Sequence, residues 1–242
     1  MKKFLLLLVF LPVMAFASEE TVHLDHAPID PDNQASLQRG ARTFVNYCLS
    51  CHSAAYMRYN RLRDIGLSEA QIKDNLLFAG EKVGETMKVA MPRVNAKAWF
   101  GAAPPDLSVE ARARTADWLY SYLRGFYRDD TRPTGWNNVV FDKVAMPHVL
   151  WQLQGQQILK TEELTDADGH VTHMHKLVLD KPGLMSTAEY DQTIADLVNY
   201  LVYMSEPGKP LRMELGLVVL LFLSLLFVVA FYLKKEFWKD IH

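Results

Sequence analysis

Two cysteines and a histidine form the stretch of this sequence with the clearest chemical meaning. Cys48 and Cys51 are three residues apart, and His52 follows the second cysteine directly. On a helix, positions i and i+3 lie on one face, so both thiols can reach the two vinyl groups along one porphyrin edge and form thioethers. The histidine is then held next to the iron as its proximal ligand. The stretch therefore predicts one covalently attached haem c.

Two other kinds of site also use a Cys-x-x-Cys pair. A structural zinc site needs four ligands, but the chain has only two cysteines, so distant histidines would have to complete it. A thiol–disulfide redox centre is expected where a strand leads into a helix, whereas a helical pattern precedes this motif. The zinc site is disfavoured, and the redox enzyme remains an alternative only for a chain without attached haem.

Two apolar segments predict how the chain is placed relative to a membrane. Residues 1–17 start with lysines, continue with an apolar run and end in the small-x-small site Ala15-Phe16-Ala17, which is typical of a cleaved export signal. An uncleaved anchor is the alternative, but the run is short for one. Residues 215–233 carry no charge over about 28 Å of helix, close to the thickness of a bilayer core. Lysines follow this segment and predict a cytoplasmic end.

These segments divide the chain into four parts in a bacterial inner membrane. We expect a signal peptide at 1–17, a periplasmic haem domain at 18–210, a transmembrane anchor at 211–233 and a cytoplasmic tail at 234–242.

The predicted periplasmic part is mildly acidic. It carries 20 Lys and Arg side chains against 25 Asp and Glu, a net charge of about −5. This balance argues against nucleic-acid binding and favours a basic soluble partner. A solubilising role for the same charge is the simpler alternative.

Helical patterns frame the cysteine motif. Apolar residues at spacings of three and four predict an amphipathic helix over 37–48, in which Gly40 marks the close approach of another element. Near the other end, Ser186 and Glu189 form a capping box before an apolar-periodic helix that Pro207 stops. An N-terminal helix carrying the cysteines and a C-terminal helix crossing it resemble the scaffold of monohaem cytochromes c.

Shorter elements are predicted between these two helices. A capping box at Ser68 starts a helix that ends near Gly80, and another helix follows Thr115 and ends at Gly125. Residues 156–179 predict a polar hairpin inserted into the domain. The expected fold class is therefore mainly α: a monohaem cytochrome c-like fold with loop insertions and a polar hairpin, plus one C-terminal transmembrane helix.

Three histidines alternate along the predicted hairpin. His170, His173 and His175 could place the last two on one face of a strand as a metal site. An exposed polar hairpin without metal is the favoured interpretation.

Two methionines compete for the position opposite the histidine. Met91 and Met146 both stand in a Lys-Val-Ala-Met-Pro segment, where proline stiffens an extended loop. A thioether ligand there raises the reduction potential of the iron, which suits electron transfer. Distance along the sequence from His52 alone favours Met91, the nearer of the two.

Several motifs follow one another along most of the mature chain. They are Gly101-Ala102-Ala103-Pro104-Pro105-Asp106-Leu107-Ser108, then Ala113-Arg114, then a Met-Pro loop, then Ser205-Glu206-Pro207 ahead of the membrane segment. In this order they resemble the cytochrome c1 family of quinol-oxidising bc1 complexes. The resemblance implies that Met146 is the sixth iron ligand, because the ligand of that family follows the Pro-Pro-Asp-Leu-Ser block. It also implies haem binding by Pro105 and a propionate contact by Arg114, with Arg112 as the alternative.

The resemblance also implies a function. The chain is expected to accept an electron from a Rieske iron-sulfur protein and to pass it to a soluble cytochrome c, as the electron-transfer subunit of a ubiquinol–cytochrome c oxidoreductase. The implied assembly is a dimeric complex that also contains cytochrome b. The alternative is the haem c subunit of a terminal oxidase or nitrogen-oxide reductase.

Overall fold

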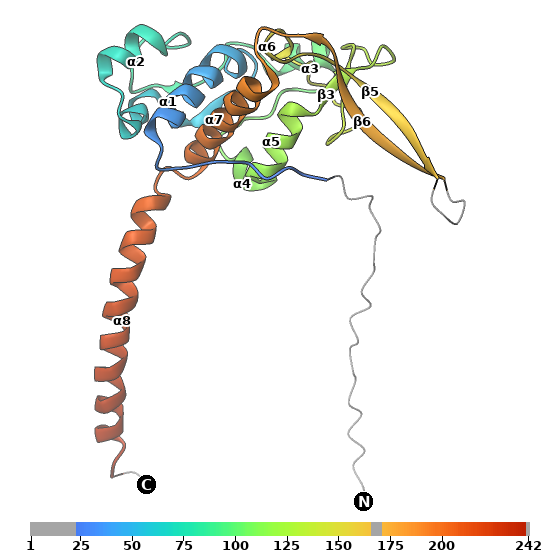
Figure 1. Ribbon diagram of the computed structural model, residues 1–242. Coiled ribbons are helices and arrows are strands. Elements are labelled where there is room, and N and C mark those ends of the chain that lie inside the picture. Colours follow the sequence, from blue (N-terminus) through green and yellow to red (C-terminus); the bar gives the residue numbers. More distant parts are fainter. Residues whose placement is uncertain (1–22, 166–170, 241–242) are drawn as a thin grey trace, which may run out of the picture.

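The computed structural model describes residues 23–165 and 171–240, which form a folded head and one long helix (Figure 1). The helices are α1 (Gln34–Thr43), α2 (Glu69–Asn75), α3 (Arg93–Phe100), α4 (Glu110–Arg114), α5 (Ala116–Arg124), α6 (Trp151–Gln154), α7 (Thr187–Ser205) and α8 (Lys209–Phe237), with a π-helical turn at Phe44–Cys48 and a 3-10 helix at Tyr59–Ile65. The strands pair as antiparallel ribbons: β1 (Ala54–Arg58) with β2 (Thr86–Met87), β3 (Phe126–Arg128) with β4 (Trp136–Asn138), and β5 (Gly155–Thr165) with β6 (Val171–Pro182). The expected mainly helical fold with one long hairpin and a C-terminal apolar helix is confirmed.

The core of the head is the crossing of α1 and α7. Gly40 sits at the contact, where an added Cβ would overlap the carbonyl oxygen of Asp196 and lie 2.7 Å from the Cβ of Tyr200. Arg39 on α1 donates to the buried carboxylate of Asp196 over 2.6 Å. The ring centroids of Phe44 and Tyr200 lie 5.6 Å apart. The predicted close approach at Gly40 is therefore confirmed.

The helix that leads into the cysteines widens in its last turn. Residues Phe44–Cys48 are π-helical, and the amide of Leu49 donates to the carbonyl of Phe44 over 3.0 Å. Such bulges are rare and concentrate at functional sites. The turn leaves Phe44, Val45 and Cys48 all buried, so the first cysteine faces the interior.

Capping boxes start α2 and α7 as the sequence predicts. At Ser186 the hydroxyl accepts from the amide of Glu189, and the carboxylate of Glu189 accepts from the amide of Ser186. The predicted end of α2 near Gly80 is wrong. Leu76 leaves the helical conformation with φ at −133°, and the amides of Leu76 and Leu77 both donate to the carbonyl of Ile72, so the helical hydrogen-bond ladder stops there.

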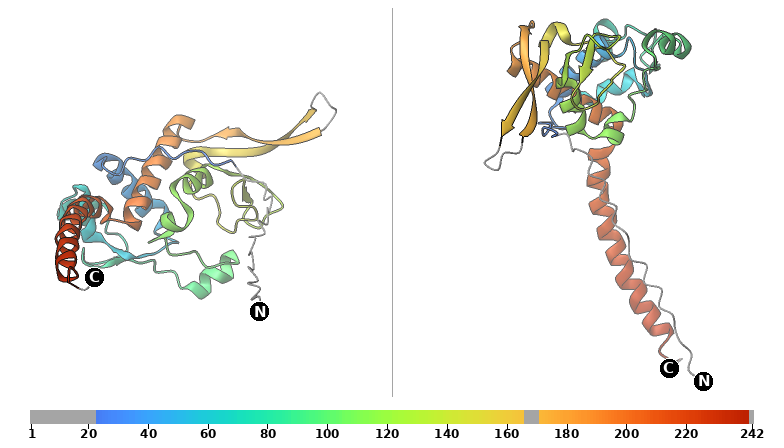
Figure 2. Two further views of the ribbon diagram at one scale, coloured as in Figure 1. Left: turned by 90° about the horizontal axis from the view of Figure 1, so that it is seen from below. Right: turned by 90° about the vertical axis from the view of Figure 1, so that its right-hand side faces the viewer.

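A two-stranded arm projects from the head (Figures 1 and 2). The strands β5 and β6 pair from Gly155 with Pro182 to Thr165 with Val171, so the predicted hairpin at 156–179 is confirmed and is slightly longer. His175 on this arm lies 3.1 Å from the hydroxyl of Thr161. His170 lies outside the described residues, and a metal site on the arm stays the less favoured alternative.

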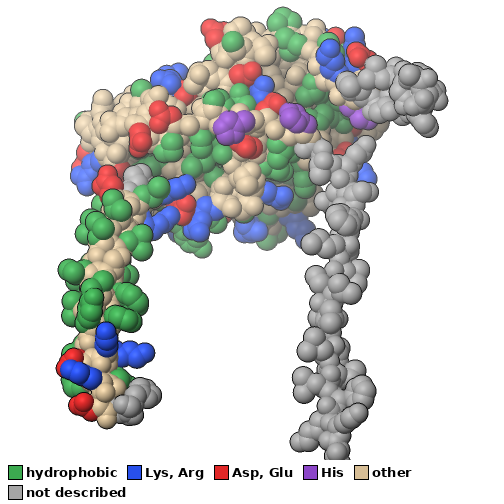
Figure 3. Space-filling view, turned by 60° about the horizontal axis from the view of Figure 1, so that its bottom comes forward, with side chains coloured by type: hydrophobic (Ala, Val, Ile, Leu, Met, Phe, Trp, Pro, Cys, Tyr) green, Lys and Arg blue, Asp and Glu red, His purple; other side chains and the backbone are tan. Residues whose placement is uncertain are grey.

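The helix α8 leaves the head and makes up the whole C-terminal part of the described chain (Figure 2). Its residues Leu211–Phe237 contain an 18-residue stretch with a mean hydropathy of 2.8, none of it buried in the head, and are long and apolar enough to cross a membrane. Hydrophobic side chains cover it, and Lys234 and Lys235 lie in its last turn (Figure 3). The helix is a single-pass membrane anchor. The predicted signal peptide at 1–17 lies outside the described residues.

Cutting the chain after Pro207 is expected to give a soluble, folded head. Glu206 then loses its 3.0 Å ion pair with Arg212 but keeps its 3.8 Å pair with Arg112, and the buried core is untouched. A pair this exposed is screened by solvent and contributes little to the stability of the head. Thermal unfolding in the absence of detergent measures the result, and aggregation of the truncated chain would contradict it.

Candidate haem site

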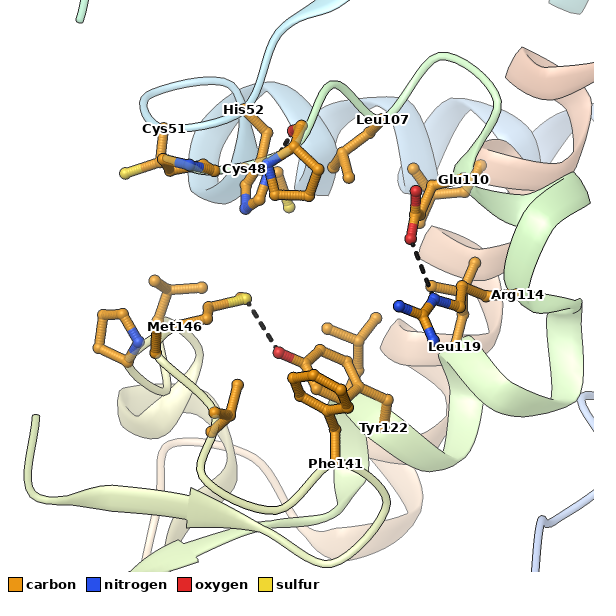
Figure 4. A pocket seen from close by; sticks show the side chains of 18 of the residues that line it. Cys48, Cys51, His52, Leu107, Glu110, Arg114, Leu119, Tyr122, Phe141 and Met146 are labelled. Carbon is orange, nitrogen blue, oxygen red and sulfur yellow. Dashed lines mark hydrogen bonds and ion pairs between the residues drawn. The ribbon is translucent and has the colours of Figure 1, made fainter. Parts of the chain in front are cut away.

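One apolar cavity in the head gathers the chemically important residues of the sequence (Figure 4). It encloses about 1300 Å³ of empty space, including its opening to solvent. All six site residues predicted from the sequence line it: Cys48, Cys51, His52, Pro105, Arg114 and Met146. Residues from the cysteine motif, α4, α5, α7 and the loop 141–149 complete the walls.

His52 is held on one wall by a backbone contact. Its Nδ1 donates to the carbonyl oxygen of Pro105 over 2.8 Å, which fixes the tautomer and leaves Nε2 for the cavity. Burial lowers the pKa of His52 despite this hydrogen bond, so the ring is neutral at pH 7. A neutral, oriented imidazole is the form that ligates iron.

The Pro-Pro-Asp-Leu-Ser block is tied to the cysteine motif by its acidic residue. The carboxylate of Asp106 accepts from the amide of Ala55 over 2.9 Å and from the amide of Ser108 over 2.8 Å. The amide of Leu107 also donates to the carbonyl of Ser53 over 2.8 Å. These bonds place the Pro105 carbonyl against His52, which gives the block a physical role.

The two cysteines form no disulfide and lie in different surroundings. Cys48 is buried, whereas Cys51 is partly exposed. Burial and then the neighbouring Cys51 raise the pKa of Cys48 to about 12. Reactive redox cysteines have lowered pKa values in electropositive surroundings, so this environment counts against a thiol–disulfide centre.

Met146 lies on the wall opposite His52, with its sulfur directed into the cavity (Figure 4). The hydroxyl of Tyr122 donates to this sulfur over 3.4 Å. Tyr122 is itself held by stacking on Trp118, with ring centroids 4.8 Å apart and planes 11° apart. Tyr122 is a site residue that the sequence analysis missed, because its i, i+4 spacing from Trp118 marks only an apolar helix face.

The competing methionine lies elsewhere. Met91 lines a separate cavity together with Lys88 and Arg93, and Cys51 is the motif residue that both cavities share. The methionine favoured by sequence distance alone is therefore not at the wall that faces His52.

The two candidate arginines point to different places. Arg114 lines the cavity, lies 3.4 Å from Glu110 and stacks its guanidinium 4.8 Å from the ring centroid of Trp118. Arg112 instead lies 3.8 Å from Glu206 and does not line the cavity. The structure thus brings Arg114, and not Arg112, to the site.

This arrangement fits a haem c. Two thiols lie on one side of the cavity, an imidazole and a thioether face each other across it, and apolar side chains line most of its wall. Arg114 at the rim offers a planar donor for a carboxylate, for which arginine is well suited. A flat, apolar macrocycle with an iron centre and two propionates requires these groups.

Comparison with known proteins agrees with this chemistry. The model described as the Cytochrome C1 family matches residues 26–241. A cytochrome c1 of Allochromatium vinosum is 48% identical and aligns over 97% of this chain and 96% of its own length. A protein of Nitrosomonas europaea named ammonia monooxygenase gamma subunit is 54% identical over 100% of this chain and 99% of its own, and a cytochrome c1 of Rhodospirillum rubrum is 31% identical over 86% and 83%. On these matches, the chain belongs to the cytochrome c1 family.

Proposed function

We propose that Cys48 and Cys51 bind one haem c covalently and that His52 and Met146 are its iron ligands. The observation that carries the proposal is the cavity in which His52 and the Met146 sulfur face each other, with both thiols at the same cavity. Membership of the cytochrome c1 family supports a respiratory electron carrier with a covalently bound haem. The bound haem supplies a one-electron iron couple between the ferrous and ferric states.

The residues that line the cavity have separate tasks in this proposal. The Pro105 carbonyl orients His52, and Arg114 binds a propionate. The apolar wall keeps water from the iron and disfavours the more highly charged ferric state. Methionine as the sixth ligand favours the ferrous state further, so the site is suited to accepting an electron at high potential.

The proposed place of the chain is the quinol–cytochrome c oxidoreductase, or bc1 complex. It accepts an electron from the Rieske iron-sulfur protein and passes it to a soluble cytochrome c, in a dimeric complex with cytochrome b. The anchor α8 supports this assembly, because it can pack against partner helices within the bilayer. The haem domain is proposed to lie in the periplasm after removal of residues 1–17, with the C-terminus in the cytoplasm.

Purification in mild detergent tests the assembly. The chain is expected to copurify with cytochrome b and a Rieske protein and to support quinol-driven reduction of cytochrome c. Replacing His52 should abolish that reduction while cytochrome b stays reducible by quinol. A terminal oxidase or nitrogen-oxide reductase subunit in the place of cytochrome b would favour the alternative.

Covalent attachment is tested on the denatured chain. Because both thiols of the chain are used as thioethers, the haem is expected to stay on the polypeptide in acidified organic solvent, and alkylation should label no cysteine. Cys51→Ala should leave one thioether and shift the alkaline pyridine haemochrome spectrum, whereas Ser50→Ala should leave it unchanged. Release of haem from the wild-type chain would contradict the proposal.

The Tyr122 hydroxyl is expected to tune the iron through the Met146 sulfur. A hydrogen bond at 3.4 Å withdraws electron density from the thioether and so favours ferrous iron. Tyr122→Phe should lower the midpoint potential by about 30–60 mV, since about 59 mV corresponds to tenfold in a one-electron equilibrium. Redox titration measures the shift, and ferric-ligand binding should become easier.

A matched control removes a buried tyrosine hydroxyl that makes no hydrogen bond to the Met146 sulfur. Tyr190 donates to the carbonyl of Leu123 over 2.9 Å, so Tyr190→Phe loses a comparable buried hydrogen bond. Its potential should stay close to that of the wild type. Equal shifts in both variants would show that the Tyr122 effect is general loosening and not tuning of the ligand.

A further inference from the structure

The helix α3 borders the haem cavity at its C-terminal end and the neighbouring cavity at its N-terminal end. Phe100, its last residue, lines the haem cavity, and Arg93, its first residue, lines the neighbouring cavity that Cys51 also lines. Between these ends only Ala96 is buried. The helix is therefore a rim element next to the more exposed of the two thiols, with most of its surface open to solvent.

Large apolar side chains are exposed on this rim. Val94 is 81% exposed and Trp99 is 64% exposed, on a helix of eight residues. Single exposed apolar residues are ordinary, but tryptophan is the residue type most enriched at the energetic centres of interfaces. The exposed Trp99, on a short helix next to a redox site, indicates a contact surface.

The charge of this rim is positive, although the predicted periplasmic domain as a whole is acidic. Residues 86–105 contain Lys88, Arg93 and Lys97 and no Asp or Glu. Within the described part of the chain, none of these three cations forms an ion pair at 4.0 Å or less. Asp106 lines the same cavity as Lys88 and Arg93. Its two carboxylate oxygens accept hydrogen bonds from the amides of Ala55 and Ser108.

The rim is also placed where a soluble molecule can reach it. The helix α3 lies in the part of the head away from the stem α8 (Figures 1 and 2). With α8 in a membrane, α3 faces the aqueous compartment. An electron that leaves at the Cys51 corner has a short path to a molecule seated on this helix.

We propose that α3 together with Lys88 forms the docking surface for the soluble electron acceptor, and that this acceptor carries acidic residues around its own redox centre. The inference rests on the proposed function. Charges beyond about 10 Å are screened at 0.1 M salt, so the three local cations outweigh the net charge of the distant domain surface. This predicts a partner of the opposite sign to the basic one that net charge alone favours.

Two small oxidants of opposite charge test the local sign without a known partner. The reduced haem of the detergent-solubilised full chain gives one electron to hexacyanoferrate(III), which becomes hexacyanoferrate(II), or to tris(phenanthroline)cobalt(III), which becomes the cobalt(II) complex. In stopped flow, the hexacyanoferrate rate should fall as salt rises. Arg93→Glu and Lys97→Glu should each reduce that rate at low salt by roughly threefold to tenfold and raise the cobalt rate.

Lys176→Glu on strand β6 is the matched control. It changes the net charge by the same amount on an exposed position of the hairpin arm, so its rates should stay within about twofold of the wild type. An equal effect of Lys176→Glu, or no effect of the α3 variants, would overturn the inference.

Soluble cytochromes of opposite charge test the partner itself. An acidic cytochrome c should be reduced faster than a basic one of similar potential. Trp99→Ala should lower the rate of reduction of the acidic cytochrome at least threefold and leave the rate of hexacyanoferrate reduction unchanged. Faster reduction of the basic cytochrome, increased further by Lys97→Glu, would overturn the inference and leave the proposed function standing. A haem-loaded wild-type complex that reduces neither cytochrome would overturn both.

Discussion

Replacing Met146 with alanine is expected to lower the reduction potential of the haem by on the order of a few hundred millivolts, because axial ligands set haem potentials over a range of about 0.8 V. The sulfur of Met146 faces His52 across the cavity and is the thioether at that wall. Without it, the ferric iron should lose its thioether charge-transfer band and bind added imidazole or cyanide. Redox titration and absorption spectra of the purified protein measure both effects.

The second methionine provides the matched control for this substitution. Met91 precedes a proline in the same pentapeptide but lines the neighbouring cavity. Met91→Ala should therefore keep the charge-transfer band and shift the potential much less. Loss of the band in the Met91 variant, with retention in the Met146 variant, would reverse the proposed assignment.

Local sequence patterns were sufficient for much of the scaffold. The capping boxes at Ser68 and Ser186 act between residues three apart, and Gly40 marks a helix crossing because its missing side chain is needed there. Such features depend on neighbours along the chain or on one close contact. They could be predicted because the sequence offers one local arrangement for each of them, whatever the rest of the fold is.

Local sequence could not decide between Met91 and Met146 as the proposed sixth iron ligand. Met91 and Met146 have identical local sequences, so only the path of the chain decides which sulfur reaches the wall opposite His52. Sequence distance favoured Met91, and the resemblance to the cytochrome c1 family favoured Met146. The cavity agrees with the second choice in geometry, because the loop 141–149 folds against α5 and brings Met146 to Tyr122.

The two arginines illustrate the same limit at shorter range. Arg112 and Arg114 are two residues apart on α4, where a helix turns by about 200°. Their side chains must leave on nearly opposite sides, so one faces the cavity and the other faces Glu206. The repeated Ala-Arg pair indicates that an arginine can reach the cavity, but it does not show whether that arginine is Arg112 or Arg114. The π-helical turn at Phe44–Cys48 likewise has no signature in the sequence pattern.

The crossing of α1 and α7 and the haem site are mechanically one unit. Helix α1 continues into the π-helical turn that ends at Cys48, and α7 supplies Leu197 and Leu201 to the cavity wall. The position of the thiols relative to the opposite wall therefore depends on how closely these two helices approach. Gly40 sets that distance.

Gly40→Ala is accordingly expected to destabilise the head by about 3 kcal/mol or more, since overpacked core contacts cost about 1–3 kcal/mol and this one meets backbone that cannot move aside. The added Cβ would overlap the carbonyl oxygen of Asp196, whose carboxylate is itself fixed by Arg39. Thermal unfolding should show a midpoint lower by roughly 6–12 °C for a domain of this size.

Gly84→Ala is the matched control, because nothing lies within 4 Å of a Cβ there, and its midpoint should change by no more than a few degrees. The Gly40 variant should also attach less haem, because separating α1 from α7 moves Cys48 away from its wall. An unchanged midpoint would show that the two helices can slide apart without cost, which would contradict the tight crossing.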